Sequence, residues 1–299
     1  IPTDWHLQHL ASRAVGGAGT VIVEASAVLA IGRISPGDVG SWSDAHLAPH
    51  ARLAAAMAAA GAVPAIQIAH AGRKASRAQA WYPAAANPSW DTAAPSALAF
   101  QGFAPPHEMT EAEIEETIAA FAAAAKRSVA AGYKMVELHA AHGYLRHQFL
   151  SPISNKRTDK WGGSFENRTR FVRECARAVR AVMPEELPLW VRISHSDWVA
   201  GGWDTPEAVE LCRMLKGLGV DLIDVSSGGL DAGQKIPLGP GYQVPGAEAV
   251  KKGADMPVAA VGLITEAKQA QEILSAGKAD VILIARASLR DPYWPMHAA

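Results

Sequence analysis

His139 and His142 lie at the end of an apolar run, and Tyr144 follows two residues later. A pair of imidazoles can hydrogen-bond a substrate carbonyl and stabilise the negative charge that develops on its oxygen. The same pair could ligate a metal ion with His70 or His195 as a further ligand, although the regular spacing of a zinc site is absent. A phenol is a suitable general acid, which a metal site rarely needs. Tyr144 therefore favours carbonyl binding with proton donation.

Gln67 and Arg192 each interrupt an apolar run of the kind that forms a buried strand. A buried amide requires hydrogen-bond partners, and a ring system with alternating donors and acceptors would provide them. A buried guanidinium is costly unless it faces an anion or an electron-rich group. A structural salt bridge of Arg192 with Glu24 or Glu137 is the alternative interpretation.

Gly262 and the pair Ala285-Arg286 each follow an apolar run near the end of the sequence. In α/β barrels the last two strands often hold a phosphate through backbone amides and a cation. Gly262 permits close approach of the backbone, and Arg286 can bind phosphate oxygens in a bidentate manner; a solvated Arg286 is the alternative. Together with Gln67 and Arg192, this pattern indicates a phosphorylated planar cofactor, and FMN fits it.

The elements that must position these residues are short and nearly continuous apolar runs, which are typical of parallel strands covered on both faces. Amphipathic helical patterns alternate with them. The predicted strands are residues 20–27, 63–69, 135–140, 189–194, 222–226, 257–261 and 281–285. The predicted helices are residues 4–15, 45–60, 111–131, 166–183, 206–218, 246–252 and 266–276.

This alternation in a chain of 299 residues favours a (β/α)8 TIM barrel over an open doubly wound sheet. One strand of the eight is missing from the pattern. Because the first predicted helix leads into the strand at Thr20, we expect the missing strand before Ile1, and the closing helix has barely started at Pro292. We therefore expect one α/β domain over residues 1–299, a barrel that lacks its first strand and its C-terminal tail. The long connection over residues 71–109 is expected to cover the active site.

The composition excludes several classes of protein. The 28 Lys and Arg residues against 29 Asp and Glu residues give a net charge of −1 without basic clusters, which argues against nucleic acid and membranes as partners. No signal peptide is recognisable, so a cytoplasmic protein is expected. Cys175 and Cys212 fall on helical patterns, where buried apolar roles are expected. A Schiff-base enzyme is disfavoured, because Lys74 follows its strand by several residues.

Four regions carry longer specific strings. They are VEASAV at 23–28 with GRI at 32–34, QIAHAGRK at 67–74, ELHAAHGYL at 137–145, and SNKRTD at 154–159 with GGSFENR at 162–168. In these strings the chain resembles the Old Yellow Enzyme family, in its bacterial NADPH dehydrogenase and xenobiotic reductase branch. The resemblance covers almost the whole chain, and the last two regions are highly specific.

The resemblance implies an FMN enzyme that takes a hydride from NADPH. It implies that Ala25 and Gln67 contact the isoalloxazine ring and that Arg192 lies near the pyrimidine edge, where reduction builds negative charge. The residues that would hold the phosphate are Gly262, Ala285 and Arg286. Ala285 stands where the family commonly has Gly, and the added methyl group is expected to have a modest effect.

On the substrate side, the resemblance implies hydride transfer to the β-carbon of a small activated alkene. His139 and His142 would bind the substrate carbonyl, and Tyr144 would give a proton to the α-carbon. The polar segment 155–168 is expected to be structural, and the assembly is expected to be a homo-oligomer. The alternatives are an FMN barrel that acts on a dienoyl thioester or an amine, and an inactive barrel fragment that binds cofactor poorly.

Overall fold

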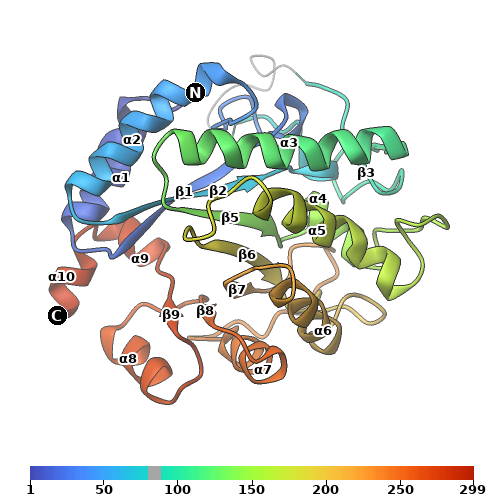
Figure 1. Ribbon diagram of the computed structural model, residues 1–299. Helices are drawn as coiled ribbons and strands as arrows, with labels where there is room; N and C mark the ends of the chain where they lie inside the picture. The colour runs from blue at the N-terminus through green and yellow to red at the C-terminus, as the bar shows by residue number, and fades with distance from the viewer. Residues whose placement is uncertain (80–88) are drawn as a thin grey trace.

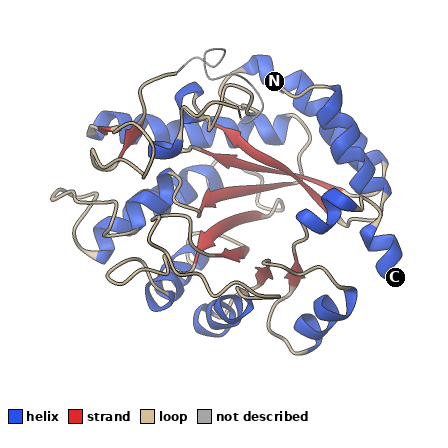
Figure 2. Cartoon of the chain, turned by 180° about the vertical axis from the view of Figure 1, so that it is seen from behind, coloured by secondary structure: helices blue, strands red, loops and turns tan. Residues whose placement is uncertain are grey.

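The computed structural model describes residues 1–79 and 89–299, and its centre is a curled, seven-stranded parallel sheet (Figure 1). The strands follow the order β1-β2-β5-β6-β7-β8-β9. Their bounds are β1 Thr20–Ala27, β2 Val63–Ala69, β5 Met135–Ala140, β6 Leu189–Ser194, β7 Leu222–Ser226, β8 Val258–Ala260 and β9 Val281–Ile282. Seen from behind, the strands fan out and the helices surround them (Figure 2). The predicted α/β class is confirmed.

The helices connect successive strands and lie along the outer side of the sheet. They are α1 Asp4–Val15, α2 Leu47–Ala59, α3 Glu111–Ala130, α4 Leu145–Leu150, α5 Phe165–Arg180, α6 Thr205–Lys216, α7 Val244–Ala254, α8 Ala267–Ser275, α9 Arg286–Arg290 and α10 Trp294–Ala298. Short 3₁₀ turns are η1 Ala30–Gly32, η2 Asp44–His46 and η3 Gly72–Lys74, and a small parallel pair joins β3 Ala93–Ala94 to β4 His107–Glu108. In the described part of the chain, none of the helices combines the length and apolarity needed to cross a membrane.

All seven predicted strands are present, but the last two are shorter than predicted. β8 begins at Val258, because Pro257 has no N–H to donate to the ladder. Beyond the end of β9, the N–H of Leu283 still donates a hydrogen bond to the carbonyl of Ala260 in β8, at 2.9 Å. β1 and β9 are the two edges of the sheet that the described residues form, so the closed barrel with a missing strand stays a prediction. Within the predicted cover over 71–109, residues 80–88 lie outside the described residues.

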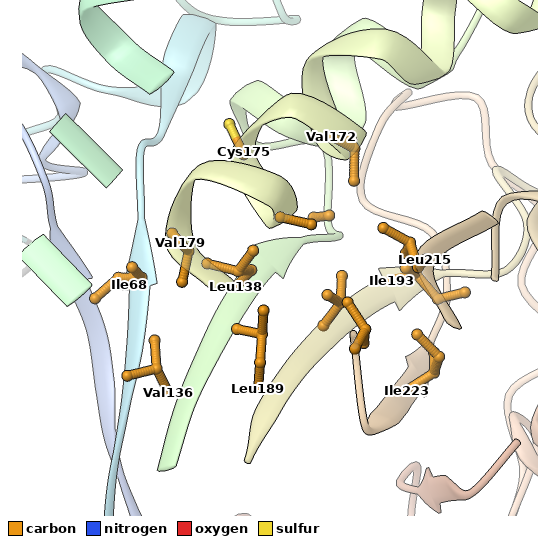
Figure 3. Packing of buried hydrophobic residues seen from close by; sticks show 14 of the residues in the cluster. Ile68, Val136, Leu138, Val172, Cys175, Val179, Leu189, Ile193, Leu215 and Ile223 are labelled. Atoms are coloured by element: carbon orange, nitrogen blue, oxygen red, sulfur yellow. The ribbon is translucent and has the colours of Figure 1, made fainter. Parts of the chain in front are cut away.

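The alternation of side chains along the strands separates the core from the inner face of the sheet. Val136 and Leu138 of β5 point toward α5 and pack in the apolar layer that Figure 3 shows. Glu137 and His139 alternate with them and therefore face the opposite side. The labelled members of the layer are Ile68, Val136, Leu138, Val172, Cys175, Val179, Leu189, Ile193, Leu215 and Ile223. One face of the sheet thus packs in the apolar core, and the opposite face carries polar residues.

The two cysteines belong to the helices on the outer side, as predicted. Cys175 of α5 and Cys212 of α6 are fully buried. Burial raises the pKa of the Cys175 thiol to about 12, so the group stays protonated and unreactive at neutral pH. Both side chains therefore act as small apolar core groups.

A buried histidine joins α2 to the neighbouring elements. His50 Nε2 lies 2.9 Å from the carbonyl oxygen of Gly40, and its Nδ1 lies 2.8 Å from the hydroxyl of Tyr133. Because the carbonyl only accepts, Nε2 carries the hydrogen and Nδ1 accepts from the tyrosine. Burial lowers the pKa of His50 to about 4. The ring is therefore held neutral in the folded protein.

Acidification should destabilise the protein through this histidine. Its pKa is lower in the folded state than the 6.5 of an unperturbed histidine, so the unfolded state binds more protons below that pH. The stabilisation is complete above about pH 6.5 and is lost as the pH falls toward 4, by on the order of 2 kcal/mol. The urea concentration at the midpoint of unfolding, measured across this pH range, should fall less steeply with decreasing pH in His50→Gln than in the wild type. Equal slopes for the wild type and His50→Gln would contradict the prediction.

Candidate functional site

Polar side chains from adjacent strands meet on the inner face of the sheet. In register, Gln67 of β2 pairs with Glu137 of β5, His139 pairs with Arg192 of β6, and Arg192 pairs with Asp224 of β7. Nε2 of Gln67 donates a hydrogen bond to Oε2 of Glu137. The structure thus brings Gln67 and Arg192, which the sequence singled out, to one side of the sheet beside a histidine of the predicted pair.

The carboxylate that pairs directly with Arg192 is Asp224. The Arg192 Nε lies 3.1 Å from its Oδ2, and the arginine side chain keeps 23% of its surface exposed toward the inner face. The salt bridge of the alternative interpretation is therefore present, but its partner is Asp224 rather than either of the two examples, Glu24 and Glu137. Glu24 is 46% exposed and lies 3.3 Å from Nε2 of His6, away from the site.

His139, His142 and Tyr144 form one cluster at the carboxyl end of β5. The ring centroid of His139 lies 5.2 Å from that of His142 and 5.0 Å from that of Tyr144, both in edge-to-face geometry. Nδ1 of His139 accepts a hydrogen bond from the N–H of Ala141, at 3.2 Å. The hydrogen of the neutral ring is therefore on Nε2, where it can be donated to a ligand.

Both histidines of the cluster are neutral. Burial holds the pKa of His139 well below its usual value, and His142 and Arg192 lower it further. Burial, followed by Arg192, has the same effect on the pKa of His142. Tyr144 is the group that can release a proton, because burial and then Asp38 raise its pKa and keep the phenol protonated through neutral pH.

A pocket borders Tyr144 at the carboxyl ends of β1 and β2. Its volume is about 220 Å³ when the space open to solvent is included. The residues that line it are Ala25, Ala27, Gly32, Ile34, Asp38, Ala69, Ala71 and Tyr144. Ala25 reaches it because the pairing of β1 with β2 shifts register between Val23 and Ser26, and such an irregularity changes the direction of a side chain. The pocket thus places the side chains of Tyr144 and Asp38 next to small apolar residues.

Lys74 also belongs to the cluster, a role that the sequence did not assign to it. Its Nζ donates hydrogen bonds of 2.9 Å to the carbonyl oxygens of His142 and Gly229 and lies 5.2 Å from the centroid of the Tyr144 ring. Burial lowers its pKa to about 8. Lys74 thereby joins the loops after β5 and β7. The sequence feature that could have indicated Lys74 is its place in the string QIAHAGRK at 67–74.

The turn after His139 has an unusual backbone. His142 and Gly143 have φ angles of 59° and 70°, in the left-handed region. A Cβ atom at Gly143 would lie 2.2 Å from the carbonyl oxygen of Gly229, so this position requires glycine. The N–H of Gly143 donates to Nδ1 of His147 at 2.9 Å, and Nε2 of that buried histidine lies 2.8 Å from Oδ1 of Asp197. These contacts fix the direction of His142.

Gln243 connects the cluster to the end of β8, and the sequence did not reveal it. Nε2 of His142 lies 2.7 Å from Oγ of Ser226, and that hydroxyl lies 3.1 Å from Oε1 of Gln243. Nε2 of Gln243 donates to the carbonyl of Val261 at 3.1 Å. A continuous chain of hydrogen bonds thus runs from the histidine pair to the residue before Gly262.

Gly262, Ala285 and Arg286 lie just beyond the ends of the neighbouring strands β8 and β9. Gly262 has a φ of 118°, and a Cβ there would lie 2.9 Å from Nε2 of Gln243. Arg286 begins α9 and is exposed. Its guanidinium makes no hydrogen bond or ion pair with the described residues, so it is free to bind an anion.

The remaining histidines do not join a metal centre. Nδ1 of His70 accepts from the N–H of Gly72 at 3.0 Å, and Nδ1 of His195 lies 3.0 Å from the hydroxyl of Thr205. Over residues 1–79 and 89–299, no group of three or more His, Cys, Asp and Glu side chains is arranged to hold a metal ion. The donors that remain, an inner-face amide, a guanidinium and an imidazole N–H, fit a planar ring with hydrogen-bond acceptors.

The polar segment 155–168 has the structural role predicted for it. The Asn155 side-chain amide donates to the carbonyls of Phe149 and Trp161, at 2.8 and 2.9 Å. The Arg157 guanidinium donates to the carbonyls of Pro95 and Met109, at 3.2 and 2.6 Å. The segment therefore ties the long connection after β2 to the loop before α5.

The sequence and the fold of this chain are similar to those of known proteins. The chain matches the NADH:flavin oxidoreductase / NADH oxidase family over residues 1–299. It is 48% identical over 297 residues to an NADPH dehydrogenase of Geobacillus sp. (strain WCH70), which covers 99% of this chain and 83% of that protein. Among solved structures it is similar to a 2-naphthoyl-CoA reductase in complex with 2-naphthoyl-CoA, with a TM-score of 0.90, 31% identity, and coverage of 99% of this chain and 46% of the other. An Old Yellow Enzyme homologue from Zymomonas mobilis gives a TM-score of 0.80, 26% identity, and coverage of 99% and 83%.

Proposed function

This chain belongs to the NADH:flavin oxidoreductase / NADH oxidase family, and from that premise we propose that it reduces the activated C=C bond of α,β-unsaturated carbonyl compounds. The resemblance to the Old Yellow Enzyme family is confirmed, and so is the prediction of an oxidoreductase with FMN and NADPH as cofactors. What is proposed is that the acceptor of the hydride is an activated alkene. The observation that supports it most strongly is the free Nε2–H of His139 beside the protonated phenol of Tyr144.

FMN, when bound, supplies a centre that accepts a hydride from NADPH and returns it to an acceptor. We assign the ring contacts to Ala25, Gln67 and Arg192, which face the inner side of β1, β2 and β6. The proposed phosphate residues are Gly262, Ala285 and Arg286. A positive guanidinium on the inner face favours a ring that gains negative charge on reduction.

On the substrate, His139 would donate its Nε2–H to the carbonyl oxygen and so polarise the C=C bond. His142 would join it by exchanging its contact with the Ser226 hydroxyl for the carbonyl oxygen. Tyr144 would place its proton on the α-carbon. Because both imidazoles are neutral, they stabilise the developing charge without releasing a proton, and the phenol provides the proton instead.

The proposal extends to the architecture and the assembly. A closed TIM barrel of one domain would enclose the inner face that carries the site. A homo-oligomer in the cytoplasm is part of the same proposal. Small-molecule activated alkenes are the proposed partners.

A thioester acceptor is the second candidate, because of the similarity to the 2-naphthoyl-CoA reductase. A histamine dehydrogenase from Rhizobium sp. 4-9 is also similar, with a TM-score of 0.83 and 28% identity, and points to an amine. The neutral histidine pair with a phenol favours an enone over an amine, since an amine offers no carbonyl oxygen to polarise.

The visible spectrum of the purified chain tests the proposal. We expect a yellow protein with FMN, which bleaches with NADPH under anaerobic conditions and recovers its colour with cyclohexenone. Recovery with an enoyl thioester but not with cyclohexenone, or bleaching of the oxidised protein by an amine in place of NADPH, would replace the substrate class. A protein that takes up no FMN would contradict the proposal and return attention to the histidine pair as a metal site.

Thermal melting with and without added FMN tests the alternative of a fragment that binds cofactor poorly. A ligand that binds only the folded state raises its apparent stability by mass action. We expect the melting temperature to rise with FMN concentration, and an unchanged value would favour the cofactor-poor fragment.

A further inference from the structure

Two buried carboxyl groups, one on β5 and one on β7, lie within hydrogen-bonding contact of each other across β6, and the proposed reaction does not use either of them. Glu137 of β5 is 1% exposed and Asp224 of β7 is fully buried. Among the described residues, Oε1 of Glu137 and Oδ1 of Asp224 face no hydrogen-bond donor, and Oδ2 of Asp224 has only the ion-pair contact with Nε of Arg192. Buried polar atoms without partners are rare, so these oxygens require an explanation.

The charges around the pair are unbalanced if both carboxyl groups are ionised. Arg192 is in direct contact with Asp224, and Gln67 of β2 contributes only a neutral amide. Arg146 of α4 acts on Glu137 as a more distant charge, and the neutral His139 lies two residues along the same strand. Burial and then Asp224 raise the pKa of Glu137, and burial raises the pKa of Asp224. Two adjacent buried carboxylates with one contacting cation favour uptake of a proton.

We propose that Glu137 and Asp224 share one proton, which Glu137 holds on Oε1 and donates to the Asp224 carboxylate, and that this pair positions Gln67 and Arg192. The shared proton supplies a partner for the oxygens that otherwise have none. It also leaves one negative charge on the pair against the one positive charge of Arg192. Glu137 and Asp224 are positioning residues, because they act through the two side chains assigned to the cofactor.

The donors then converge on Asp224. The Gln67 amide donates to Glu137, Glu137 donates to Asp224, and the Arg192 guanidinium lies against the same carboxylate from the other side. This order keeps the Gln67 amide in one orientation and keeps Arg192 turned toward the inner face. The inference rests on the proposed function for its consequence, since the charge of Arg192 matters most where a flavin is reduced.

The midpoint potential of bound FMN tests the charge balance. Glu137→Gln reproduces a protonated carboxyl, since its amide can accept from Gln67 and donate to Asp224, and we expect it to leave the potential unchanged. Asp224→Asn removes the negative charge beside Arg192. We expect it to move the equilibrium at least about tenfold toward reduced FMN, which is about 30 mV for a two-electron couple. Equal shifts in the two variants, or no shift in Asp224→Asn, would overturn the proposal.

Infrared spectroscopy of the wild-type protein tests the proton itself without any flavin. With ¹³C-labelled glutamate, we expect the band of a protonated carboxyl group at neutral pH, which disappears in Glu137→Gln and persists in the exposed control Glu24→Gln. Absence of that band in the wild type would refute the shared proton even if Asp224→Asn fails to fold. If the band is present and FMN does not bind, the proposed function fails and the carboxyl pair stands.

Discussion

Replacing His139 by alanine should slow the oxidation of the reduced protein by cyclohexenone about 100- to 1,000-fold. The reason is that Nδ1 of His139 is occupied by the N–H of Ala141, which leaves Nε2–H as a donor of fixed direction for the carbonyl oxygen. Reduction by NADPH makes no use of that oxygen and should change much less. Rapid-mixing absorbance measurements separate the two half-reactions.

The control for this variant is His297→Ala, which removes an exposed imidazole from α10. It should leave both half-reactions at the wild-type rate. If His139→Ala oxidises as fast as this control, His139 has no part in binding the carbonyl. If instead both half-reactions fall together, the variant has disturbed the cofactor site rather than substrate activation.

Tyr144→Phe should slow the same oxidation step about 100- to 10,000-fold, since it removes the proposed proton donor and leaves the ring in place. The wild-type rate should be independent of pH through the neutral range, because the raised pKa of Tyr144 keeps the phenol protonated there. The wild-type rate should also fall in deuterium oxide, and the variant should lose this isotope effect.

Tyr293→Phe is the matched control, because it removes the hydroxyl of an exposed tyrosine. It should retain both the rate and the isotope effect. A Tyr144→Phe variant that keeps the full rate would show that the proton comes from solvent or from another residue.

The sequence predicts the strands well because their runs are buried on the helix side and are rich in branched apolar residues. It predicts helix ends less well, since the periodicity of residues 45–60 does not show that the first turn, Asp44–His46, is a 3₁₀ helix. Helix α4, Leu145–Leu150, is six residues long and too short for a periodic signal. These differences arise from local geometry that apolar patterns do not encode.

The candidate site is predictable from the sequence where its residues are close together along the chain. His139, His142 and Tyr144 are neighbours in sequence and form one cluster in space. Asp224 as the partner of Arg192 depends on the order of the strands, which no local pattern contains.

Lys74 and Gln243 depend on how loops close over the strand ends. Lys74 reaches the carbonyls of His142 and Gly229, and Gln243 reaches Ser226 and the residue before Gly262. Each contact joins segments far apart in the chain, so it becomes visible only when the fold is known.

The pocket beside Tyr144 has consequences for engineering the acceptor range. Ala25, Ala27, Ala69 and Ala71 already carry the smallest side chain that a strand or its end tolerates without losing stability. Random substitution at these positions therefore produces mainly variants with a narrower pocket. Ile34 is the lining position where a shorter apolar side chain would add room. For the proposed alkene reduction, a mutant library that aims at bulkier alkenes should start there. One that aims at selectivity for small alkenes should start at Ala27, Ala69 and Ala71, because Ala25 is assigned to the flavin ring.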